Sequence, residues 1–197
     1  MKKLPVLLFY ICSLSMLVNL YPALVGYGEN TFDSISLISS TTAWFSYLFS
    51  LYFLSWKPND RNPLVYLNIL LLATIFFPLF DVFLKSTENL KMASEGLLPG
   101  IYVFMNYASR ISLLLFSVGV LFRKELALRI AMITLASLIF TSFSVTFYEL
   151  IAMFIRGEPQ STFTLISKIL DPVAIMSTFL LQLYLILNRK IVVEALR

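Results

Sequence analysis

Six long apolar runs divide this chain, and they limit its possible folds more than any other feature of the sequence. A run of about 18 or more apolar residues is long enough to cross the hydrocarbon core of a bilayer as one helix. The runs cover residues 4–26, 33–55, 64–84, 99–122, 128–155 and 162–187. They predict an all-α fold, a polytopic integral membrane protein whose six transmembrane helices form one helical bundle within a single transmembrane domain, residues 1–197.

The composition and the connectors agree with lipid as the solvent. Apolar residues make up 59% of the chain and charged residues only 13%, whereas about a quarter of the residues of a soluble domain are charged. The longest connector, residues 85–98, is polar and has room for a helical turn but not for a core of its own. The first run lacks a signal-peptide cleavage site, so we expect it to be a retained helix and expect no soluble domain.

Lys and Arg residues predict the orientation in the membrane, because cytoplasmic loops carry an excess of both. Connectors on one side of the predicted bundle hold ten of these residues, and those on the other side hold three. The ten are Lys2, Lys3, Lys57, Arg61, Arg123, Lys124, Arg129, Arg189, Lys190 and Arg197, and the three are Lys85, Lys91 and Arg156. We therefore expect both termini in the cytoplasm (N-in/C-in) and a bacterial inner membrane, a plasma membrane, as the location.

The residue types that are scarce argue against several classes of enzyme. Histidine, the commonest general base and a common metal ligand, is absent, and Cys12 is the single cysteine. The sequence also lacks a GxGD-type protease motif and a clustered Asp motif of phospholipid synthesis. We therefore expect no enzyme, no metal and no cofactor. The basic residues lie in short clusters between apolar runs, so we expect no nucleic-acid partner either.

Five charged residues inside the predicted spans are the candidate functional residues. They are Asp81, Arg110, Glu149, Lys168 and Asp171. A charge at the centre of a bilayer costs roughly 2.5 to 3.5 kcal/mol on insertion scales, so it usually faces a partner or a water-filled cavity. With a rise of about 1.5 Å per residue, all five are predicted to lie in the outer half of the membrane or at its midplane.

Helical spacing extends these charges into polar faces. Tyr102, Asn106 and Arg110 follow one another at intervals of four residues, which places them on one side of the fourth predicted helix. In the sixth predicted helix, a similar face contains Thr164, Lys168, Asp171, Thr178 and Gln182. We expect these faces to turn inward together. A stripe of small residues in the second predicted helix, Ser36, Ser39, Ala43, Ser46 and Ser50, predicts close helix packing.

Two interpretations of the charges stay open. In the first, an outward-facing polar pocket binds a small anionic or zwitterionic solute in a transporter subunit or membrane sensor, and Arg110 clamps a carboxylate or phosphate. In the second, the charges are structural ion pairs in a non-catalytic scaffold or assembly subunit, which the scarcity of glycine inside the spans favours. Both imply contact with the lipid bilayer and with a protein partner within the membrane. An intramembrane enzyme is the least favoured alternative.

Overall fold

The structure, a computed structural model, describes residues 6–11, 13–14, 31–56, 60–156 and 162–196. All regular structure in these ranges is helical. The helices are α2 (Thr31–Trp56), α3 (Arg61–Leu84), α4 (Ser86–Ser94), α5 (Leu97–Leu121), α6 (Glu125–Arg156), α7 (Thr162–Leu187) and α8 (Arg189–Leu196). The predicted all-α fold class is confirmed for this part of the chain.

Among the described residues, four helices are long and apolar enough to cross a membrane. They are α3, Pro99–Leu121 of α5, α6, and Lys168–Leu187 of α7, and they match the last four predicted spans. Helix α2 covers the second predicted span, 33–55, and is not one of the four. The first predicted span, 4–26, lies largely outside the described residues.

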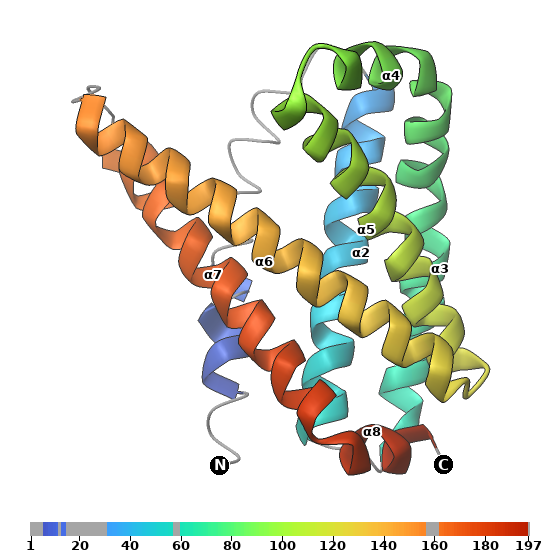
Figure 1. Cartoon of the computed structure of the whole chain (residues 1–197). Coiled ribbons are helices and arrows are strands. Elements are labelled where there is room, and N and C mark those ends of the chain that lie inside the picture. The colour runs from blue at the N-terminus through green and yellow to red at the C-terminus, as the bar shows by residue number, and fades with distance from the viewer. Residues whose placement is uncertain (1–5, 12, 15–30, 57–59, 157–161, 197) are drawn as a thin grey trace.

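The helices form a bundle with two different ends (Figure 1). Helices α2, α3 and α5 stand side by side, and α6 crosses them obliquely with α7 beside it. Helix α4 covers one end of α3 and α5, and α8 lies across the opposite end, where it contacts α2, α6 and α7. Toward the α4 end, α6 and α7 extend away from α2 and α3.

Helix α2 supplies much of the packed interior. Its residues Tyr47, Leu51 and Leu54 are fully buried. They belong to one cluster that also contains Leu71 of α3, Phe116 of α5, Leu135 of α6, Leu181 of α7 and Val192 of α8. The Phe116 ring meets the Tyr47 ring edge-on, with 4.8 Å between centroids. Every helix except α4 thus contributes to one interior.

The small-residue stripe of α2 is packed as the sequence predicted. Ser36, Ala43, Ser46 and Ser50 are buried, and α2 packs closely on α3. The Ser46 hydroxyl donates to the Thr42 carbonyl at 2.9 Å, and the Ser50 hydroxyl donates to the Ser46 carbonyl at 2.8 Å. Both hydroxyls are satisfied within their own helix, so the burial of Ser46 and Ser50 leaves neither hydroxyl unpaired.

A buried polar cluster joins α2, α3 and α5 at the level of Asn68. The Asn68 amide donates to the Ser50 hydroxyl at 3.1 Å and to the Leu64 carbonyl at 2.8 Å, and the Ser117 hydroxyl donates to the Asn68 carbonyl at 2.7 Å. Asn68, Ser50 and Ser117 are all fully buried. Such interhelical hydrogen bonds average about 0.6 kcal/mol in membrane proteins, so the cluster defines the register of three helices more than it adds stability.

Helices α5 and α6 approach each other most closely at Gly119. A Cβ atom on Gly119 would lie 2.7 Å from the Leu128 nitrogen and 2.9 Å from the Leu128 Cα. The turn between the two helices is a Schellman motif, in which the Lys124 amide donates to the Gly119 carbonyl at 2.8 Å and the Arg123 amide to the Val120 carbonyl at 3.4 Å. Arg123 has a φ of 56°, the left-handed conformation that this motif requires.

Replacing Gly119 by Ala is expected to destabilise the protein, because the new methyl group would collide with backbone atoms that cannot rotate away. Overpacking of this kind costs typically about 1–3 kcal/mol, and it opposes the gain of about 1 kcal/mol that alanine brings to a helix. Thermal unfolding of the purified protein in detergent measures the change. Gly100→Ala is the matched control, since its Cβ would meet only the Ala93 oxygen at 3.4 Å. Equal melting temperatures for the two variants would contradict the close approach.

Candidate functional site

The structure brings some of the predicted site residues together at the α4 end of the bundle and separates others. Asp81 of α3 and Arg110 of α5 form one group, and Tyr102 of α5 and Glu149 of α6 form another. Lys168 and Asp171 lie on α7, which runs beside α6.

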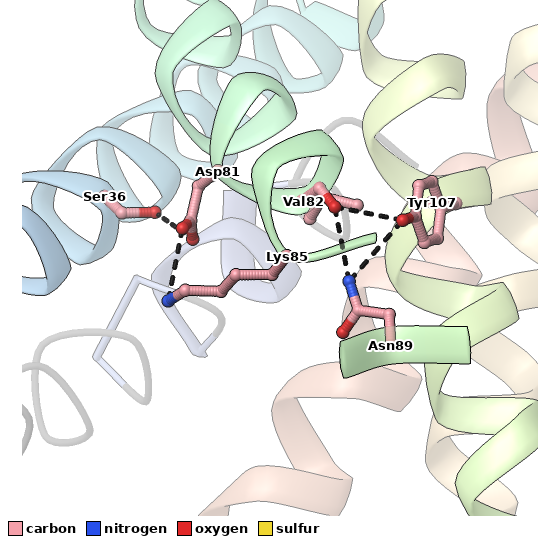
Figure 2. A network of polar contacts seen from close by, with 6 residues as sticks. All are labelled: Ser36, Asp81, Val82, Lys85, Asn89 and Tyr107. Carbon is pink, nitrogen blue, oxygen red and sulfur yellow. Dashed lines mark hydrogen bonds and ion pairs between the residues drawn. The ribbon is translucent and has the colours of Figure 1, made fainter. Parts of the chain in front are cut away.

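Asp81 lies one turn before the end of α3 and is buried. The Ser36 hydroxyl of α2 donates to Asp81 Oδ2 at 3.0 Å, and Lys85 Nζ lies 3.2 Å from Asp81 Oδ1 (Figure 2). Sequence reasoning counted Lys85 among the connector residues and assigned Ser36 to helix packing. The i, i+4 spacing of Asp81 and Lys85 is a signal that identifies this ion pair. No such signal connects Ser36 to Asp81, because their contact depends on how α2 packs on α3.

Arg110 is the cation that faces this carboxylate from α5. Its side chain is half-buried, and both Asp81 and Tyr107 interact with the guanidinium electrostatically. The Nη1 atom of Arg110 is buried without a hydrogen-bond partner. Two of the five charged candidates, Asp81 and Arg110, thus interact electrostatically, and one guanidinium donor of Arg110 has no hydrogen-bond partner inside the bundle.

Two side chains hold the end of α3 against α5 beside this group. The Tyr107 hydroxyl donates to the Val82 carbonyl at 3.0 Å, and the Asn89 amide of α4 donates to the same carbonyl at 3.3 Å (Figure 2). Val82 carries one of the last four carbonyls of α3, which lack partners within an α-helix. Sequence reasoning did not identify Asn89, because no local pattern connects a residue of α4 to a carbonyl seven positions earlier in α3.

Tyr102 and Glu149 connect α5 to α6 nearer the ends of the two helices. The Tyr102 hydroxyl donates to Glu149 Oε1 at 3.0 Å, and both side chains are exposed. Asn106, one turn further along α5, is exposed as well. The expectation that these faces turn inward together is not met here.

The reason is the divergence of the helices toward the α4 end. Asn106 and Arg110 lie on the same face of α5 as Leu113, Ser117 and Val120, which are at most 2% exposed. The face is therefore continuous, but only its later part is covered, by α3 at Ser117, which donates to the Asn68 carbonyl, and by α6 at Gly119. Nearer the start of α5 the helices have separated (Figure 1), and α6 reaches α5 there through the side-chain hydrogen bond between Tyr102 and Glu149.

Helix α7 shows the same gradient along its polar face. Gln182 is fully buried and its amide donates to the Met132 carbonyl of α6, and Thr178 is 6% exposed. Asp171 is half-buried and Lys168 is exposed. The side chain of Thr164, predicted on this face, lies outside the described residues. The polar face of α7 is thus closed near its middle and open near its start.

At the opposite end of the bundle, an ion pair joins α8 to the start of α6. Arg189 Nε lies 2.7 Å from Glu125 Oε1. The hydrogen bond to this carboxylate raises the pKa of Arg189. Across the described residues, no three Cys, Asp or Glu side chains gather closely enough to hold a metal ion.

Comparison with known proteins assigns no family to this chain. The sequence matches no protein-family model, and no curated protein or solved structure is significantly similar to it.

The Tyr107→Phe variant is expected to lower the free energy of unfolding by about 1 kcal/mol, since it removes the hydroxyl that bonds the end of α3. Thermal or denaturant unfolding in detergent measures this loss. Tyr66→Phe removes the same hydroxyl from a residue that is 72% exposed and is expected to change nothing. If both variants unfold like the wild type, Tyr107 does not hold α3 against α5.

Proposed function

We propose that this protein binds a small anionic or zwitterionic solute at the α4 end of its bundle, as a transporter subunit or a membrane sensor. The observation that carries the proposal is the buried Nη1 donor of Arg110. This atom has no hydrogen-bond partner, although the guanidinium interacts electrostatically with Asp81. Leaving a charged donor unsatisfied costs more than the roughly 1–3 kcal/mol of a neutral group. A carboxylate or phosphate of a solute would satisfy it, and two parallel hydrogen bonds to a guanidinium would orient that group.

Asp81 gives the site its second charge. Its carboxylate is oriented by Ser36 and neutralised in part by Lys85, whose side chain is 43% exposed. The ammonium group of a zwitterionic solute can take the place of a mobile, partly solvated lysine at this carboxylate, because exposed ion pairs contribute only about 0–1 kcal/mol. A solute with both charges would then bridge α3 and α5.

The burial gradients along α5 and α7 support access from the α4 end. Side chains on the inward faces are buried near Ser117 and Gln182 and become exposed toward Asn106 and Lys168. A solute approaching from this end would meet Tyr102, Asn106 and Glu149 before it reached Arg110. The other end of the bundle is closed by the apolar interior and by α8.

A second function is favoured by the exposure of Glu149 and Lys168. Both lie within helices that are long and apolar enough to cross a membrane, and both are exposed on the surface of the chain. A charge at such a position is commonly paired within the membrane. The alternative is therefore a scaffold or assembly subunit, in which a partner helix carries the complementary charges.

Replacing Arg110 by Gln tests the solute site. Thermal-shift measurements with a panel of amino acids, carboxylates and phosphate esters would identify a stabilising compound for the wild type. The variant is expected to bind that compound about 10- to 100-fold more weakly, since a hydrogen bond to a charged group contributes about 1.5–3 kcal/mol. Arg123→Gln makes the same charge change at an exposed residue and is the matched control.

The stability of the ligand-free variant distinguishes the two functions. If Arg110 binds a solute, its removal leaves the ligand-free protein about as stable as the wild type, because relief of the unsatisfied Nη1 donor offsets the lost attraction to Asp81. In a structural ion-pair network, the same change would strand Asp81 and lower the melting temperature. If the variant is destabilised and no compound in the panel stabilises the wild type, the solute site is contradicted and the scaffold function is favoured.

The proposal includes six membrane crossings with both termini in the cytoplasm of a bacterial plasma membrane. Described basic residues support it, since Arg61, Arg123, Lys124, Arg129, Arg189 and Lys190 belong to connectors predicted on the cytoplasmic side, and the Arg189–Glu125 ion pair brings α8 and the start of α6 to one end. Only Lys85, Lys91 and Arg156 belong to the other side.

Reporter fusions are expected to follow this orientation. A reporter after Arg197 should be active in the cytoplasm, and one inserted after Glu88 in the exposed helix α4 should be active outside. The measurement uses a paired set of enzymes, one active only in the cytoplasm and one only outside. A reporter that is active in the cytoplasm at both positions would overturn the outward orientation of the solute site.

A further inference from the structure

A shallow hollow lies at the end of the bundle opposite α4, between the start of α6, the end of α7 and α8. The polar side chains that line it are Arg129, Arg189 and Glu125, and its apolar side includes Met132, Ile133 and Leu185. One small site thus presents two guanidinium groups next to an apolar wall. The solute site proposed above uses none of these residues.

The charges of the hollow favour a singly charged anion. Glu125 Oε1 lies 2.7 Å from Arg189 Nε and also interacts electrostatically with Arg129. Two guanidinium groups against one carboxylate leave one positive charge. Because Glu125 contacts Arg189 through Nε, this contact leaves the terminal Nη groups of Arg189 for a second anion. The two Nη groups of a guanidinium can together bind two oxygens of a phosphate.

The apolar wall and the position of α8 indicate that the anion is attached to a lipid. Ile133 is 50% exposed beside the arginines, and Leu187, at the end of α7, is 74% exposed. Helix α8 buries Val192, Ala195 and Leu196 against the bundle while Arg189 and Lys190 stay exposed. Because α8 begins two residues after α7, a helix long and apolar enough to cross a membrane, we place α8 near headgroup depth. A free anion would gain nothing from the wall, whereas an acyl chain would cover it.

We propose that this hollow binds the headgroup phosphate of an anionic phospholipid. Arg129 and Arg189 hold the phosphate oxygens, Glu125 orients Arg189, and an acyl chain lies along Met132 and Ile133 toward the membrane interior. Basic sites between membrane helices near the cytoplasmic surface are suited to anionic lipids. Lipid bound here would connect α8 to α6.

The test measures lipid binding to the purified full-length protein in detergent by native mass spectrometry. Phosphatidylglycerol is the probe, phosphatidylcholine is the neutral lipid, and glycerol phosphate supplies the headgroup without acyl chains. Arg129→Gln is expected to weaken phosphatidylglycerol binding by about tenfold. Arg123→Gln, which removes the same charge from an exposed residue outside the hollow, is expected to leave the affinity within about twofold.

Two further variants, Arg189→Gln and Glu125→Gln, allow the proposal to be tested even if one of the variants fails to fold. Arg189→Gln should also weaken binding, although it breaks the ion pair with Glu125. Glu125→Gln should strengthen binding of phosphatidylglycerol, because it removes the carboxylate that repels the phosphate. A merely structural role for these residues predicts weaker binding in both variants.

Three results would overturn the proposal. Equal losses in Arg129→Gln and Arg123→Gln would show that anionic lipid binds by general charge. Equal affinity for phosphatidylcholine would show that the arginines do not distinguish an anionic headgroup from one with no net charge. Glycerol phosphate that displaces phosphatidylglycerol at equal concentration would identify a site for a soluble phosphate instead of a lipid.

Discussion

The pairing of polar groups inside an apolar bundle is the constraint on which the rest of this structure depends. Without water nearby, a helix as rich in Ser and Thr as α2 can be buried only if its hydroxyls find partners in the protein. Ser46 and Ser50 find them in their own helix, and Ser50 also accepts from Asn68 of α3. Ser117 extends the same contact to α5. The positions of α3 and α5 around α2 follow from these bonds and from the small side chains that permit close approach.

A second consequence is the difference between the two ends of the bundle. Gly119 brings the backbones of α5 and α6 together beside their common turn, and helices that cross at an angle separate with distance from the contact. The polar face of α5 is buried at Ser117, which contacts Asn68 of α3, and exposed at Asn106. The close contact at Gly119 thus belongs to the closed end of the bundle, and the candidate charges lie toward the open end.

The sequence predicted the parts of the fold that depend on local pattern. The apolar runs located α3, α5, α6 and α7 to within a few residues, and the spacing of small residues identified the packed face of α2. Periodicity also placed Asn106 and Arg110 on the correct face of α5. It did not predict their exposure, because burial along a face depends on the crossing of α5 and α6. The role of Asn68 was equally hidden, since one polar residue in an apolar run does not reveal its partner.

The same asymmetry would limit how a solute at the proposed site could act on this protein. At the closed end, backbone contact at Gly119, the buried cluster around Asn68 and the docking of α8 leave little room for helices to slide. At the open end, α5 and α6 are joined by an exposed hydrogen bond between Tyr102 and Glu149, which is broken at small cost. A solute bound as proposed between Arg110 and Asp81 would link α5 to α3, and any movement of α5 that follows would break this hydrogen bond more readily than the contacts at the closed end. Such a movement is suited to reporting or capturing a solute, with a partner in the membrane to receive it.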